Sequence, residues 1–302
     1  MEVVLLGTAA GGGFPQWNCW CPPCTLARAD TAAAHPRTQS AAAVSADGRH
    51  WFLLNASPDV REQVGRLNGD RPSTVRHVPL EGIVVTDAEL DHTLGIALVR
   101  EARHLRLYAT PAVRSVLETD SRILPVTRAF AAVELHELVL GEETPLLLAG
   151  GEPSGLTVEC FAVHGDPPRF ASRELPGHTV GLVIRQPGRT GTCAFVPGCG
   201  ELDDTLLERL GTVDLVLFDG TFWRDDELLA LGISTNTARE MGHVPVSGPG
   251  GSLERLRLLP ARWRVYTHIN NSNPMLIEHS AERAEVIAAG LQVGDDGMRF
   301  EL

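Results

Sequence analysis

The 302-residue sequence contains no lysine, so all 26 of its positively charged side chains are arginines. The absence of lysine excludes a P-loop, a lysine Schiff base and a lysine general base. Acidic side chains outnumber arginines by 38 to 26, which gives a net charge of −12. This balance argues against binding to nucleic acid or to an anionic membrane surface, because both need basic patches.

The sequence also lacks long apolar runs. No stretch reaches the length of a membrane-spanning helix, and the first residues show no basic segment followed by an apolar one, as a signal peptide would. We therefore expect a cytoplasmic protein with no membrane partner. In a reducing compartment, the six cysteines are expected to be metal ligands or free thiols rather than disulfides.

Short apolar runs separated by turn-forming residues predict a layered α/β fold. Without a repeat or an obvious linker, the simplest account is a single domain over residues 1–302. The proline-rich, charged stretch 165–177 is expected to be a surface loop or lid. The predicted strands are 3–6, 51–55, 83–86, 105–109, 180–184, 194–197, 215–218 and 264–267, and the predicted helices are 111–119, 203–210, 253–258 and 281–289.

Three cysteines, Cys19, Cys21 and Cys24, fall within six residues of the loop 17–26. Three thiolates in a short loop suit a tetrahedral structural zinc, with a fourth ligand from elsewhere in the chain. The alternatives are incidental thiols and a redox Cys-x-x-Cys motif. The redox motif requires a helix after its first cysteine, and we expect Pro22 and Pro23 to prevent that helix. Cys160 and Cys193 are predicted to be core residues.

Four ionisable side chains, Asp87, Glu89, Asp91 and His92, follow a strongly apolar strand. Such groups are costly after a buried strand unless they pair or bind a metal. A solvated turn with an Asp N-cap explains the cluster about equally well on its own. The later segments Met-Gly-His at 241–243 and Thr-His at 267–268 favour the metal site.

The order of these motifs resembles that of the metallo-β-lactamase superfamily, whose fold is a four-layer αββα sandwich. Segments 10–24, 218–249 and 267–274 are more closely similar to the PqqB family of pyrroloquinoline quinone (PQQ) biosynthesis. The unusual sequences Gly-Gly-Gly-Phe-Pro-Gln-Trp-Asn-Cys and His-Ile-Asn-Asn-Ser-Asn-Pro carry this resemblance. The phosphodiesterase of the carbon–phosphorus lyase pathway resembles this chain in its cysteine motif. By that similarity the fourth zinc ligand is Asn271, or His35 in its place.

The sequence departs from the superfamily at the first metal site. Asp87 and Glu89 replace two histidine ligands, and Gly198 stands where a bridging aspartate is expected. His164 or His178 could supply the third histidine, but neither is spaced convincingly.

The resemblance leaves Asp91, His92 and His268 as ligands of one catalytic metal. One carboxylate and two imidazoles suit a non-haem Fe(II), although zinc or manganese could replace it. By resemblance the substrates are O₂ and the cross-linked Glu–Tyr diamino acid cut from the PqqA peptide, whose tyrosine ring is hydroxylated. His243, Asp219 and Glu89 are then candidates for proton transfer or substrate contact, and Asp59 for support of the site.

Two other functions stay open at this point. One is a metal-dependent hydrolase of an ester or phosphodiester. The other is a carrier or transport protein for PQQ or its precursor, and other proteins of the pathway are candidate partners.

Overall fold

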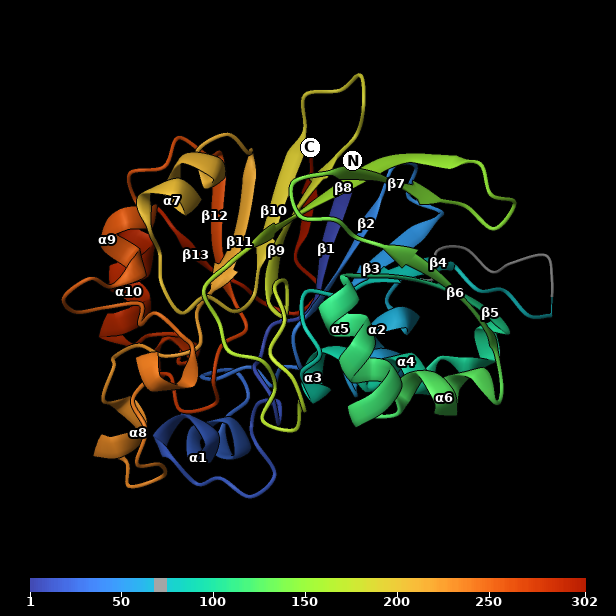
Figure 1. Ribbon diagram of the computed structural model, residues 1–302. Coiled ribbons are helices and arrows are strands. Elements are labelled where there is room, and N and C mark those ends of the chain that lie inside the picture. Colours follow the sequence, from blue (N-terminus) through green and yellow to red (C-terminus); the bar gives the residue numbers. More distant parts are fainter. Residues whose placement is uncertain (68–74) are drawn as a thin grey trace.

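Two β-sheets form the centre of the molecule, and helices cover their outer faces (Figure 1). The computed structural model describes residues 1–67 and 75–302. Within these residues each sheet has seven strands, in the orders β14-β1-β2-β3-β4-β5-β6 and β13-β12-β11-β10-β9-β8-β7. This four-layer αββα arrangement confirms the predicted metallo-β-lactamase fold.

The first sheet contains β1 (Glu2–Gly7), β2 (Ala41–Ser45), β3 (Trp51–Leu54), β4 (Leu80–Val84), β5 (His104–Ala109), β6 (Ala132–Glu137) and β14 (Arg299–Glu301). The second contains β7 (Glu143–Leu147), β8 (Pro153–Ala162), β9 (Val180–Arg185), β10 (Thr192–Val196), β11 (Leu215–Asp219), β12 (Trp263–Thr267) and β13 (Gln292–Val293).

The helices next to the first sheet are α2 (Val60–Gly65), α3 (Leu90–Thr93), α4 (Gly95–Leu98), η1 (Arg100–Ala102), α5 (Pro111–Ser115), the π-helical turn η2 (Val116–Asp120) and α6 (Ile123–Arg128). The others are α1 (Pro22–Ala29), α7 (Asp204–Leu210), α8 (Glu227–Ala230), η3 (Arg239–Met241), α9 (Ser252–Leu256), η4 (Pro274–Leu276) and α10 (Ala281–Ala288).

Alternation along the strands separates the apolar layers. In β1, Val3 and Leu5 face the layer between the sheets, whereas Val4 and Leu6 face the helices of the first sheet. Residues that alternate along a strand point to opposite faces, so a strand buried on both faces reads as a continuous apolar run. This explains why the central strands are visible in the sequence as short apolar segments.

The structure contains all eight predicted strands and all four predicted helices, with shifted ends. Stretch 165–177 contains no helix or strand and is therefore a loop, as predicted. In the described residues, we find no helix with the length and apolar character needed to cross a membrane.

One prediction about the cysteine loop is wrong. Helix α1 begins at Pro22, with Cys21 as its N-cap residue, so Pro22 and Pro23 start a helix instead of preventing one. Proline is favoured in the first turn because the backbone N–H groups there have no partner within the helix.

Candidate metal centre

The functional side chains follow the carboxyl ends of strands from both sheets. Asp87 comes after β4, Asp219 ends β11 and His268 comes directly after β12. Strands β10, β11 and β12 are parallel, as are β3, β4 and β5, so their carboxyl ends lie at a common edge. Side chains at strand ends are held rigidly, and binding sites of α/β folds form at such edges.

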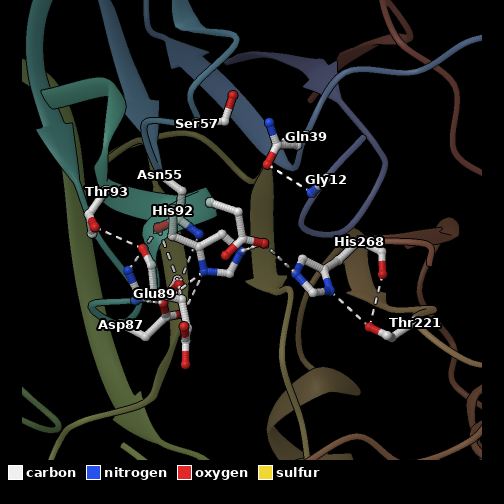
Figure 2. Close-up of polar contacts among 12 residues, drawn as sticks. Gly12, Gln39, Asn55, Ser57, Asp87, Glu89, His92, Thr93, Thr221 and His268 are labelled. Atoms are coloured by element: carbon white, nitrogen blue, oxygen red, sulfur yellow. Dashed lines mark hydrogen bonds and ion pairs between the residues drawn. The ribbon is translucent and has the colours of Figure 1, made fainter. Parts of the chain in front are cut away.

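Three histidines meet at this edge, and each has its Nδ1 atom occupied. His92 Nδ1 donates to both oxygens of Asp87 at 2.8 and 2.7 Å, and His268 Nδ1 donates to Thr221 Oγ1 at 2.8 Å (Figure 2). His243 Nδ1 lies 2.7 Å from Asp219 Oδ2. Hydrogen bonds of this kind fix the ring orientation and leave Nε2 as the available nitrogen.

The free nitrogens of two of these rings meet the carboxylate of Asp91. Asp91 Oδ2 lies 3.3 Å from His268 Nε2 and 3.8 Å from His92 Nε2. His92 Nε2 is buried and has no hydrogen-bond partner among the described residues. A buried nitrogen without a partner beside a carboxylate and a second imidazole fits a bound metal ion. Asp91, His92 and His268 are thus brought together as predicted.

Electrostatics in this cluster favour a cation. Burial lowers the pKa of His92, but the charges of Asp87 and Asp91 outweigh it and raise the pKa to about 9. Burial raises the pKa of Asp91, yet His92 and His268 hold it well below its ordinary value. The cluster therefore stabilises positive charge between carboxylates, which a metal ion supplies in place of protons.

Asp219 and His243 form a second pair next to this cluster. Buried Asp219 also accepts hydrogen bonds from the backbone N–H groups of Cys199 and Thr221 and from the Thr221 hydroxyl. The imidazole of His243 stacks on that of His268, with ring centroids 5.5 Å apart. With its oxygens engaged in these contacts, Asp219 holds His243 in position and lies behind the cavity wall.

The glycine-rich loop contacts the cluster from the other side. A Cβ atom on Gly11 would lie 3.2 Å from Asp91 Oδ2, so a side chain at this position would crowd the carboxylate. The backbone N–H of Gly12 donates to Gln39 Oε1 at 3.0 Å (Figure 2). Gln39 in turn donates to Asp59 through its backbone and its side chain. Asp59 thus supports the glycine loop through Gln39.

A cavity of about 370 Å³ opens over the cluster. Glu89 lies in its wall, where partial burial raises its pKa to about 7, with a further increase from Asp87 and Asp91 and a small decrease from Arg169. The lining residues are Ala10, Gly11, Asp87, Glu89, Asp91, His92, Gly165, Asp166, Pro167, Arg169, Thr179, Gly198, Thr221, Phe222, Glu240, Met241, Gly242, His243, His268 and Asn270.

The two histidines left unassigned lie outside this lining. His178 is buried, and its Nε2 accepts a hydrogen bond from the backbone N–H of Leu175. His164 is exposed, with its two nitrogens 3.8 Å from Glu201 and Asp203. Gly198 does line the cavity, so the position of the bridging aspartate carries no ligand.

The cysteine loop forms a separate candidate site. The sulfurs of Cys19, Cys21 and Cys24 lie within 4.8 Å of one another. Asn271 reaches the same point, with its Nδ2 atom 3.3 Å from Cys24 Sγ and its backbone oxygen 3.4 Å from Cys21 Sγ. The hydrogen bond between Cys21 and Cys24 lowers the pKa of the Cys24 thiol and raises that of Cys21, so Cys24 is the first of the two to form a thiolate, the form that binds zinc. The alternative ligand His35 instead contacts Asp295 at 3.1 Å.

The chain is similar to known proteins of the beta-lactamase superfamily. Residues 50–269 match the model of the beta-lactamase superfamily domain. A diphosphatase from the PhnP family has the same fold, with a TM-score of 0.69 at 22% identity over 100% of this chain and 97% of that one.

The particular family follows from closer relatives. The chain is 42% identical to coenzyme PQQ synthesis protein B of Methylobacterium nodulans over the full length of both, and 40% identical to that of Rhizobium meliloti over 100% of this chain and 98% of the relative. The structure of Zn(2+)-bound PqqB from Methylobacterium extorquens matches with a TM-score of 0.90 at 40% identity and full coverage of both chains. The chain belongs to the family of coenzyme PQQ synthesis protein B.

Proposed function

We propose that this protein is a metal-dependent oxygenase of coenzyme PQQ synthesis, acting in the cytoplasm. Its substrate is the cross-linked Glu–Tyr diamino acid, and it hydroxylates the tyrosine ring. The observation that carries the proposal is the meeting of Asp91 Oδ2 with the free Nε2 atoms of His92 and His268 beneath an open cavity. Membership of the PQQ synthesis family supports the substrate class.

Asp91, His92 and His268 would hold a single metal ion. This donor set leaves coordination positions open, and Fe(II) bound to it would activate O₂. Zinc and manganese also fit a carboxylate and two imidazoles, and a relative has been solved with zinc. At the superfamily's first metal site, Asp87, which is bound to His92, and Glu89 stand in place of two histidines, and Gly198 stands in place of the bridging aspartate.

The surrounding residues orient the ligands and handle protons. Asp87 and Thr221 fix the His92 and His268 rings through Nδ1. His243, held by Asp219, lies in the cavity wall and can give or take a proton at Nε2. The balanced reaction converts a ring C–H and O₂ to a ring C–OH and water, with two electrons and two protons from a reductant such as ascorbate.

The second site would be structural. Cys19, Cys21, Cys24 and Asn271 surround one point with donors that suit tetrahedral zinc, provided that the amide of Asn271 turns its oxygen towards the ion or its backbone oxygen binds. Arg28 holds this loop by donating to the backbone oxygens of Cys19, Cys24 and Gln16.

The test is anaerobic reconstitution with Fe(II), followed by addition of ¹⁸O₂, ascorbate and the cross-linked Glu–Tyr diamino acid. We expect a product that has gained one labelled oxygen, detected by mass spectrometry, and no product from His268→Ala. Zinc at the cysteine site should be unchanged in that variant. Binding of the diamino acid without any labelled product, under every metal tested, would refute the oxygenase and favour a carrier. Hydrolysis of esters or phosphodiesters in its place would favour a hydrolase.

A further inference from the structure

The cavity is lined by more negatively than positively charged side chains. Five carboxylates line it, those of Asp87, Glu89, Asp91, Asp166 and Glu240, whereas Arg169 is the single arginine among the described lining residues. Asp87 is bound to His92, and Asp91 belongs to the candidate metal centre. Arg169 makes no ion pair or hydrogen bond with any residue that the structure describes, although these carboxylates line the same cavity.

Arg169 also lies at the boundary between two hollows. It lines the cavity over the metal centre and a second hollow of about 360 Å³, and Gly11, Glu89 and Asp91 are shared by both. The second hollow adds two exposed apolar side chains, Leu90 and Phe170. The site therefore extends from the metal centre past Arg169 to a partly apolar shelf, which is enough room for a ligand larger than one amino acid.

The unpaired charges define which ligand groups fit. A guanidinium offers planar, paired N–H donors that match a carboxylate. The side chains of Glu89 and Asp166 form no ion pair with Arg169, so opposite charges line one cavity and remain available to a ligand. An α-amino acid carries both complementary groups, an anionic carboxylate and a cationic ammonium.

We infer that Arg169 binds an α-carboxylate of an amino-acid substrate, with Glu89 and Asp166 receiving its ammonium group. This assignment rests on the proposed function, and it names Arg169 as the residue that selects the zwitterionic diamino acid. It also places the loop 165–177 in the substrate site. Ligands with several carboxylates and no ammonium group should bind weakly, because three further carboxylates face the same space.

Direct binding to the zinc-loaded protein in the absence of O₂ tests the assignment separately from turnover. The probes are the cross-linked Glu–Tyr diamino acid and its methyl ester, measured by calorimetry. Arg169→Met should weaken binding of the free acid about 10- to 100-fold, as expected for loss of hydrogen bonds to a charged group. Binding of the ester should be weak in the wild-type protein and unchanged in the variant.

Two control variants keep the result interpretable. Arg173→Met removes an arginine from the same loop without changing the lining of either hollow, and should bind as the wild type does. Arg169→Lys should recover part of the lost affinity because it restores the charge. Turnover assays should show the Arg169→Met defect mainly in KM.

Equal binding of the free acid by the wild type and Arg169→Met would overturn the inference, as would an equal loss for acid and ester or no binding of the acid by the wild type. Binding that depends on Arg169 without hydroxylation would instead leave the inference standing and refute the proposed oxygenase. Hydroxylation with an unchanged KM in Arg169→Met would refute the inference about Arg169 and leave the proposed oxygenase standing.

Discussion

Replacing Asp87 should weaken the catalytic metal site without removing any of its ligands. Both oxygens of the buried Asp87 carboxylate accept from His92 Nδ1, at 2.8 and 2.7 Å. The same carboxylate accepts from Thr86 Oγ1 at 2.7 Å and from the Glu89 backbone N–H at 2.9 Å. An Asp87→Asn variant keeps the size of the side chain and one acceptor oxygen. It removes the negative charge that stabilises the His92 ring when that ring binds the metal.

The expected loss of metal affinity follows from the hydrogen bonds between Asp87 and His92. Outer contacts of metal-binding histidines are worth about 10- to 100-fold in metal affinity, or about 1.4 to 2.8 kcal/mol. The assay is competition for Zn²⁺ or Fe²⁺ against a chelator, with the cysteine site followed separately through its thiolate absorption. Asp203→Asn is the matched control, because Asp203 caps α7 and asparagine caps a helix equally well. An affinity for the catalytic metal within twofold of wild type would refute the argument that Asp87 orients His92.

Two further variants test the cysteine site and the buried side chain of Glu227. Cys24→Ser should release the structural zinc and lower the melting temperature by several degrees, since an ion present at 1,000 times its Kd adds about 4.1 kcal/mol to the free energy of unfolding; an unchanged zinc content would refute this site. Glu227→Gln should flatten the pH dependence of stability, because burial outweighs the hydrogen bonds of Glu227 and raises its pKa from 4.5 to about 7. The folded protein then holds a proton that the unfolded chain releases, so wild-type stability should fall between pH 4.5 and 7 by on the order of 3 kcal/mol, at 1.36 per pKa unit. If the melting temperatures of wild type and Glu227→Gln changed with pH in the same way across this range, that expectation would be contradicted.

The central strands were predictable because each is buried on both faces and reads as a short apolar run. The strands that the sequence analysis missed are of another kind. Strand β2 is Ala-Ala-Ala-Val-Ser, in which Val44 is the single β-branched residue of the kind typical of strands, although all five residues are buried. Strand β6 is half polar and has no fully buried residue, and β8 begins with Pro-Ser-Gly. Packing between the two sheets stabilises β2 and β8, and Val133 and Leu135 of β6 pack against the helix-side cluster. These contacts are not visible in the local sequence.

The ligands of the metal centre could be found because histidines after buried strands are unusual. Arg169 could not, because a single arginine in a proline-rich loop is typical of any exposed surface. Its significance comes from the carboxylates that line the same cavity, which are contributed by segments as far apart as residues 89 and 240. Thr221 was missed for a similar reason, since a threonine two residues after a strand gives no sign that it holds His268.

Asp87 and Glu89, which stand in place of two superfamily histidines, have different surroundings in the structure. By the superfamily resemblance both acids stand where metal ligands are lost, and Glu89 is in addition a candidate for proton transfer or substrate contact. The structure separates them: Asp87 is buried and turned towards His92 Nδ1, whereas Glu89 lies in the cavity wall without an ion pair among the described residues. One acid therefore supports the surviving metal ligand, and the other is free to meet the substrate. Under the proposed function, Glu89 would then serve substrate recognition, whereas Asp87 would serve the single metal beside a cavity for a charged amino acid.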